Sequence, residues 1–157
     1  MNIKLVVVAK TEEKYLQEGI DIYLKRLKHY VNFEMVVIPA LKDTKNASAE
    51  DIKEREGVLI LKQLEKSDVT ILLDEHGKEF TSVGFSQYLQ KQMNSGIRTL
   101  TFVVGGAFGF SRQVYDKANG KISLSQMTFS HQMIRLFFVE QLYRAFTILK
   151  GEPYHNE

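Results

Sequence analysis

Residues 100–110 read LTFVVGGAFGF, a run of strand-forming residues that ends at two adjacent glycines. Apolar runs without polar alternation are typical of strands buried on both faces of a sheet. Glycines at the carboxyl end of such a strand let a ligand approach the backbone, and open α/β sheets bind ligands at that edge. The segment therefore predicts a buried strand followed by a ligand site. A tight turn without a ligand is the alternative.

Other segments extend this pattern along the chain. Apolar runs at residues 3–9, 33–39, 69–73 and 99–104 predict four buried strands. Helical periodicity between them predicts helices at 16–27, 52–64 and 81–94, the last capped by Thr81 or Ser82. This alternation predicts an α/β fold with a mostly parallel sheet flanked by helices. Residues 122–124 predict one more short strand, and the polar segment 43–54 predicts a mobile loop.

Length and composition limit the class of protein. The chain has 157 residues, so a single domain spanning 1–157 is expected. It contains no cysteine, which excludes disulfides and thiolate metal sites. The apolar start is too short for a signal peptide or a membrane span, which favours a cytoplasmic protein that binds no membrane. The net charge of +2 is small for a nucleic-acid-binding surface, so a second subunit would be needed to build one.

The end of the chain is unusually apolar. Residues 131–150 predict one long helix whose polar groups do not gather on one face. A helix that is apolar nearly all round needs burial on several sides. A homodimer that packs on this helix is therefore expected.

Familiar ligand motifs are absent from the sequence. Ala107 breaks the G-x-G-x-x-G dinucleotide pattern, and no Gly-Lys-Ser/Thr follows the glycines. The histidines at 29, 76, 131 and 155 share no metal-binding spacing, so no metal is expected. Asp74, which the pattern places at the end of a strand, can bind a ribose or cap a turn, and the cap is favoured. His76 is expected in the loop that follows.

A few polar residues stand out against the apolar end of the chain. His131 can move a proton near neutral pH, or can simply start the helix. Arg144 can bind phosphate or a carboxylate, or can pair with Glu140 one turn earlier. Tyr154 and His155 lie in a short tail, where disorder is the usual outcome.

Two segments, VVGGAFGF at 103–110 and ISLSQMTFSHQMIRLFFVEQLYRAFTILKGEPYH at 122–155, closely resemble a known family. It is the family of ribosomal large-subunit pseudouridine N3-methyltransferase H, which belongs to the SPOUT, or α/β-knot, methyltransferases. The resemblance also covers the Ala-Lys pair at 9–10, IDIYLKRLKHY at 20–30, VVIPA at 36–40 and LLDEHGK at 72–78. It runs the whole length of the chain.

The resemblance implies a Rossmann-like sheet whose C-terminal part forms a trefoil knot. It implies that S-adenosylmethionine binds in the knot, held by backbone groups and apolar walls. By motif position, the cofactor-binding residues would be Leu73, Gly105, Leu124, Ser125, Gln126, Met127, Thr128 and Phe129.

The resemblance further implies methylation at N3 of a pseudouridine in 23S ribosomal RNA, on the assembled ribosome. DNA is not an expected partner, and the homodimer is the expectation from the apolar helix. Alignment and loss of the N3 proton are then the enzyme's main tasks. His131 would be the base or would orient it, and Arg144 would stabilise negative charge or grip phosphate. Tyr154 and His155 would complete the pocket, from the same or the partner subunit. Some relatives carry a basic residue directly after the Tyr-His pair, where this chain has Asn156. The positive charge of that residue would have to come from another part of this protein.

Other functions remain open at the level of sequence. A knotted methyltransferase could act on ribose 2′-hydroxyls or on a guanine of transfer RNA. A ribosome-binding factor could hold the cofactor without turnover. A flavodoxin-like nucleotide binder is disfavoured, because the loops lack phosphate-binding spacing.

Overall fold

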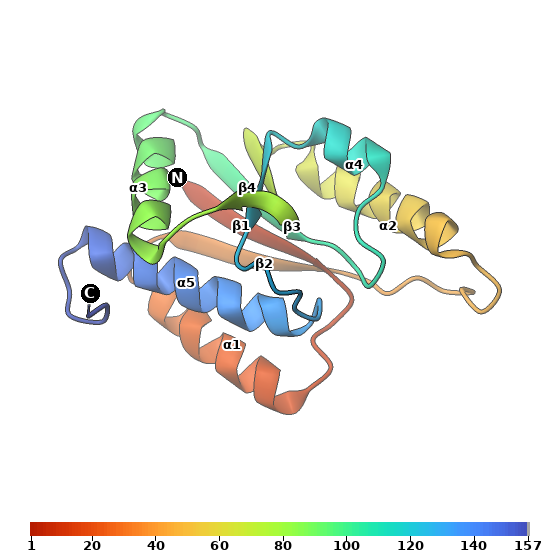
Figure 1. Ribbon diagram of the computed structural model, residues 1–157, viewed down its shortest axis with the longest axis horizontal. Helices are drawn as coiled ribbons and strands as arrows, with labels where there is room; N and C mark the ends of the chain where they lie inside the picture. Colours follow the sequence, from red (N-terminus) through yellow and green to blue (C-terminus); the bar gives the residue numbers. More distant parts are fainter. Residues whose placement is uncertain (157) are drawn as a thin grey trace.

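The computed structural model describes residues 1–156, in which strands and helices alternate along the chain. The strands are β1 (Asn2–Val8), β2 (Asn32–Ile38), β3 (Val69–Glu79), β4 (Thr99–Val104) and β5 (Gly120–Ser123); the helices are α1 (Lys14–Leu27), α2 (Ala49–Leu64), α3 (Ser82–Asn94), α4 (Arg112–Lys117) and α5 (Met133–Leu149). The strands form one sheet in the order β2-β1-β4-β3-β5, and every pair in it is parallel (Figure 1). The predicted α/β class is confirmed.

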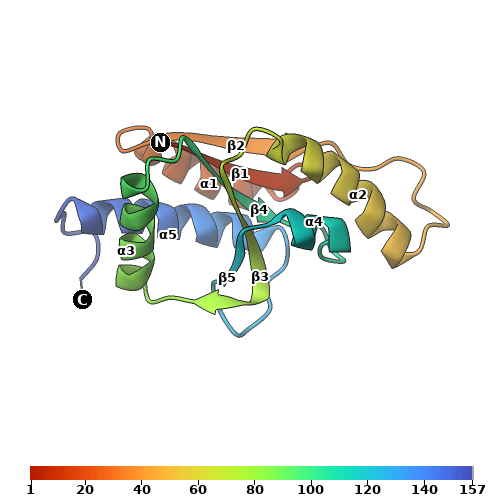
Figure 2. The ribbon, with the colours of Figure 1, turned by 90° about the horizontal axis from the view of Figure 1, so that it is seen from above.

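Helices cover both faces of this sheet, as the apolar runs predict. In β1 the fully buried Ile3, Leu5 and Val7 join the core beneath α1, α3 and α5, whereas Val6 joins a second core beneath α2 and α4. Figures 1 and 2 show the two groups of helices on opposite sides of the strands. The alternation of β1 between two cores explains why its sequence is apolar throughout.

Helix α5 lies across the first face, between α1 and α3 (Figure 1). Its own residues Phe138 and Leu142 are fully buried, whereas its Phe137 is 38% exposed. The two neighbouring helices therefore supply much of the burial that this apolar helix needs. Its composition alone does not require a second subunit.

The third strand is longer than predicted. β3 continues past Leu73 to Glu79, with a register shift, and Lys78 pairs with Ile122 of β5. The expectation that Asp74 ends the strand and that His76 lies in a loop is wrong. These residues are polar, so apolar patterning could not identify them as strand; the extension depends on pairing with β5.

Element boundaries differ from the prediction at two further places. Helix α2 starts at Ala49 rather than residue 52, because the Ser48 hydroxyl accepts a hydrogen bond from the Asp51 N–H at 3.0 Å. The predicted loop at 43–54 is therefore helical in its second half. Helix α5 starts at Met133, so residues 131 and 132 form a turn before it. The Thr81 cap of α3 is confirmed, with its hydroxyl 2.9 Å from the Gly84 N–H.

In the described part of the chain, no helix is long and apolar enough to cross a membrane. The trefoil knot stays a prediction from the resemblance.

Candidate active site

A cavity of about 640 Å³ lies where the carboxyl ends of β3 and β4 meet β5 and the segment before α5. Its volume is within the range of small-molecule sites in proteins, roughly 300–1,000 Å³. The lining residues come from four segments of the chain: Leu73, Asp74, Glu75, His76, Val104, Gly105, Gly106, Ala107, Phe108, Gly109, Phe110, Tyr115, Ile122, Ser123, Leu124, Ser125, Met127, Thr128, Phe129, Ser130, His131 and Ile134. This is the sheet edge at which the sequence predicts a ligand site.

The glycine loop, residues 105–109, forms one wall of the cavity. At Gly105 a Cβ atom would lie 3.2 Å from the Phe110 ring and 3.3 Å from the Gly109 backbone, so a side chain there would be crowded. Gly109 adopts a φ of 87°, in the left-handed region, and its N–H donates to the Gly106 carbonyl at 3.1 Å. The loop is thus folded tightly on itself and presents backbone to the cavity.

The segment 124–130 forms the opposite wall, and its own side chains hold it in place. The Ser123 hydroxyl donates to the Ser125 carbonyl at 2.7 Å, and the Ser125 hydroxyl accepts from the Met127 N–H at 2.9 Å. Thr128 donates to the Glu75 carboxylate of β3 at 2.7 Å. Hydrogen bonds therefore stabilise this wall internally and connect it to β3.

The predicted cofactor residues nearly all meet at this cavity. Its lining includes Leu73, Gly105, Leu124, Ser125, Met127, Thr128 and Phe129. Gln126 is outside the lining. Tyr115 and the extended part of β3 also line the cavity. No sequence pattern indicates this position for Tyr115, which comes from the short helix α4.

The fixed charges around the cavity are negative. Asp74 and Glu75 line it, and among the lining residues of the described chain there is no lysine or arginine. Asp74 accepts hydrogen bonds from the His76 N–H at 2.8 Å and from the Tyr115 hydroxyl. Burial and the Asp74 carboxylate raise the pKa of the Tyr115 phenol, so it stays a neutral donor. Such surroundings favour a cationic ligand and disfavour phosphate groups.

His131 is the one predicted catalytic residue at this cavity. It lies in the turn before α5 and is half-buried. Burial lowers the pKa of its imidazole, the nearby positive charge of Arg135 lowers it further, and Glu12 opposes both. The imidazole is therefore neutral near pH 7 and can accept a proton.

Arg135 lies directly beneath His131 and is fully buried. Its guanidinium donates to the carbonyls of Val8 and Ala9, at 2.7 and 2.8 Å, and its Nε donates to the His131 carbonyl at 3.1 Å. Ala9 has a φ of 67°, an unfavourable backbone conformation for alanine. Arg135 therefore ties the end of β1 to the turn that carries His131.

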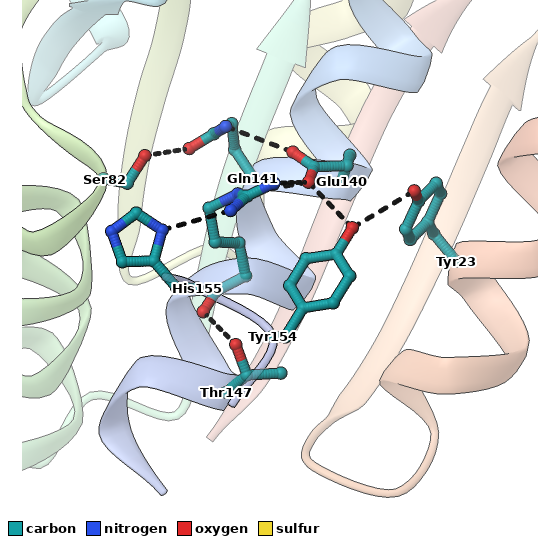
Figure 3. Close-up of polar contacts among 8 residues, drawn as sticks. Tyr23, Ser82, Glu140, Gln141, Thr147, Tyr154 and His155 are labelled. Carbon is teal, nitrogen blue, oxygen red and sulfur yellow. Dashed lines mark hydrogen bonds and ion pairs between the residues drawn. The ribbon is translucent and has the colours of Figure 1, made fainter. Parts of the chain in front are cut away.

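The other three predicted catalytic residues, Arg144, Tyr154 and His155, form a separate group with Glu140, which we call the tail cluster (Figure 3). Arg144 pairs with the Glu140 carboxylate at 2.5 Å and contacts His155 Nδ1 at 3.1 Å. The Tyr154 hydroxyl donates to Glu140 at 2.9 Å and lies 3.3 Å from the Tyr23 hydroxyl of α1. Burial, then Tyr23 and Glu140, raise the pKa of Tyr154, so its phenol stays protonated.

The tail cluster does not line the main cavity in the same chain. Glu140 instead lines a smaller cavity of about 250 Å³, which shares Ile122, Ser123, Leu124 and Phe129 with the main one. Only the pairing of Arg144 with Glu140 could be foreseen, from their i, i+4 spacing. The contact with Tyr23 joins residues 131 positions apart, which no local pattern reveals.

Comparisons with known proteins agree with this geometry. Residues 1–155 match the family model described as "Predicted SPOUT methyltransferase". The chain is 60% identical to the ribosomal RNA large subunit methyltransferase H of Flavobacterium johnsoniae over 157 residues, which is 100% of both chains. It is 58% identical to the protein of the same name from Parabacteroides distasonis, again over 100% of both chains.

Two solved structures are similar in fold. A probable methyltransferase from Bordetella pertussis Tohama I aligns with a TM-score of 0.57 over 92% of this chain and 95% of that one, at 10% identity. A probable methylase family protein from Haemophilus influenzae Rd KW20 aligns with a TM-score of 0.53 over 99% of this chain and 70% of that one, at 11% identity. At such low identity these matches concern the fold alone. With the family match over nearly the whole chain, they lead to one conclusion: this protein belongs to the SPOUT methyltransferases.

Proposed function

We propose that this enzyme transfers a methyl group from S-adenosylmethionine to N3 of a pseudouridine in 23S ribosomal RNA, on the assembled ribosome and in the cytoplasm. The full-length similarity to relatives named ribosomal RNA large subunit methyltransferase H supports the RNA target. The single observation that carries the proposal is the cavity itself, which gathers seven of the eight residues expected to hold the cofactor.

The chemistry of the cavity fits this cofactor. Apolar side chains such as Leu73, Val104 and Ile122 suit an adenine ring, and backbone groups of the glycine loop are available for its polar edge. Asp74 and Glu75 suit a ligand with a net positive charge, as S-adenosylmethionine has. When bound, the cofactor supplies an electrophilic methyl group on a sulfonium. Leu124, Ser125 and Thr128 would hold it from the opposite wall.

Removal of the N3 proton is the step for which the chain itself must provide a group. His131 is neutral and lies at the cavity wall, so it can accept that proton. Arg135 fixes the turn through the His131 carbonyl, which positions the imidazole without touching the substrate. After the transfer, the His131 imidazolium would return its proton to water, which restores the neutral base.

The tail cluster would complete the active site of a second copy. Arg144, Tyr154 and His155 lie outside the cavity of their own chain, although their residue types suit an RNA phosphate or a developing anion. Around the cavity mouth Met127 is 77% exposed, and Phe129 and Phe137, whose ring centroids are 4.9 Å apart, are 36% and 38% exposed. Exposed apolar groups gathered in this way favour a subunit interface. The proposal therefore includes a homodimer.

A transfer assay with S-adenosylmethionine labelled in its methyl group tests this function. Assembled ribosomes, separated subunits and protein-free ribosomal RNA are supplied in turn. Transfer to the ribosomal RNA of assembled ribosomes is expected, with much less to the other two. Cofactor binding by calorimetry without transfer to any of them would instead indicate a binding factor.

A further inference from the structure

Helix α2 buries a carboxyl group directly behind the glycine loop. Glu56 is only 8% exposed, although it comes from the face of the sheet opposite α5. A Cβ atom on Gly106 would lie 2.5 Å from its Oε1 and 2.7 Å from its Oε2. The carboxyl group therefore fills the space left by the missing side chain of Gly106, a residue that lines the main cavity.

The neighbouring residue keeps this carboxyl group in place. A Cβ atom on Gly57 would lie 2.5 Å from the Ser111 hydroxyl, which caps the N-terminus of α4. Two glycines, Gly57 on the helix and Gly106 on the loop, thus allow α2 to approach the loop from Gly106 to Ser111 closely.

Hydrogen bonds do not fully compensate for the burial of this carboxyl group. Glu56 Oε1 is buried and has no partner among the described residues, and none of their ion pairs includes Glu56. Burial raises the pKa of Glu56. A buried carboxyl oxygen without a hydrogen bond lowers the stability of a fold.

We propose that Glu56 gives the cavity its preference for the positively charged cofactor over the neutral product of methyl transfer. Only the backbone of Gly106 separates its carboxylate from the ligand space, since Gly106 has no side chain. Asp74 and Glu75 are also nearby, but each already accepts hydrogen bonds. The described residues provide no hydrogen-bond donor for Glu56 Oε1, and its burial leaves little water to screen a charge there, so the field of an ionised Glu56 extends to a bound cation with little screening.

This inference rests on the proposed cofactor. Methyl transfer turns S-adenosylmethionine, which carries a sulfonium, into S-adenosylhomocysteine, a thioether with one positive charge fewer. The attraction toward Glu56 is lost at that step. Glu56 therefore favours exchange of the used cofactor for a new one, without touching either.

The test compares the affinities of the two ligands by calorimetry at pH 8, in the wild-type protein and in Glu56→Gln, which keeps the size of the side chain. Glu54→Gln removes the same charge from the same helix and is the matched control. Glu56→Gln is expected to bind S-adenosylmethionine about tenfold more weakly, with S-adenosylhomocysteine affinity unchanged within about twofold. Glu54→Gln should change neither affinity by more than about twofold.

A second variant separates charge from packing. Glu56→Asp keeps the carboxylate and should retain most of the preference for the charged ligand. Equal weakening of both ligands in Glu56→Gln would mean that Glu56 only shapes the loop, and would overturn the proposal. An unchanged affinity ratio, or a loss in Glu56→Asp as large as in Glu56→Gln, would overturn it too. A wild-type protein that binds neither ligand would instead refute the proposed function, and this inference with it.

Discussion

His131 is the residue on which the proposed proton transfer depends. Replacement by glutamine is expected to lower kcat on ribosomes roughly 100-fold or more, because general bases contribute at least that much. Cofactor affinity, measured by calorimetry, should stay within about twofold of wild type, since glutamine keeps a polar group of similar size. Near-normal turnover in this variant would remove His131 from the mechanism.

The same residue should make the fold sensitive to acid. Burial and Arg135 depress the pKa of folded His131, so the unfolded chain binds a proton more readily than the folded one. Its contribution to stability is therefore present above the unfolded pKa, about 6.5, and is lost as the pH falls below it. Urea unfolding at pH 7.5 and pH 5.5 should show a smaller loss in His131→Gln than in wild type. Equal losses would contradict this assignment.

Arg135 holds the turn and the end of β1 together. Arg135→Met is expected to lower the free energy of unfolding by roughly 3 kcal/mol or more, because buried carbonyls lose charged donors. The matched control is Arg112→Met, which breaks the 3.0 Å surface pair with Asp116. That change should cost less than about 1 kcal/mol. Urea denaturation of both variants measures the difference; similar losses would show that the Arg135 network contributes little.

At the scale of elements, the pairing of β3 with β5 shapes the cavity. A side chain on Gly77 would meet the Ile122 backbone N at 2.6 Å, so Gly77→Ala must push the two strands apart. We expect a loss of roughly 2–4 kcal/mol in unfolding free energy and weaker cofactor binding, because the segment 124–130 follows β5. Gly120→Ala, whose Cβ would lie 3.4 Å from Ile71, is the control and should be tolerated. Unchanged cofactor affinity in Gly77→Ala would contradict this link.

The elements also show how far a sequence can be interpreted alone. Strands of continuous apolar residues and the Thr81 cap were predictable, because local composition determines them. The polar half of β3 was not, since its strand geometry arises from contact with β5, some 40 residues later. Within the site, the family resemblance indicated His131 and the segment 124–129. Tyr115 reaches the cavity, and Glu56 reaches the back of the glycine loop, through tertiary packing, which leaves no local pattern.

At the scale of the whole molecule, the separation of His131 from the tail cluster predicts a shared active site. Two inactive variants, His131→Gln and a chain that ends at Glu152, can be mixed under conditions that allow subunit exchange. If the tail acts on the partner's cavity, each mixed dimer has one complete site out of two. Random exchange makes about half of the dimers mixed, so roughly a quarter of wild-type activity should return. Light scattering should show dimers before and after mixing. Monomers, or no recovery from mixed dimers, would contradict the shared site.

The central claim concerns which atom receives the methyl group. The most direct measurement is mass spectrometry of nucleosides and oligonucleotides from 23S ribosomal RNA, compared between cells with and without this gene. The proposed function predicts that one N3-methylated pseudouridine disappears in the deletion and returns with the wild-type gene but not with the His131→Gln variant. Loss of a ribose methylation or of a methylated guanine in transfer RNA instead, with N3-methylpseudouridine intact, would contradict it.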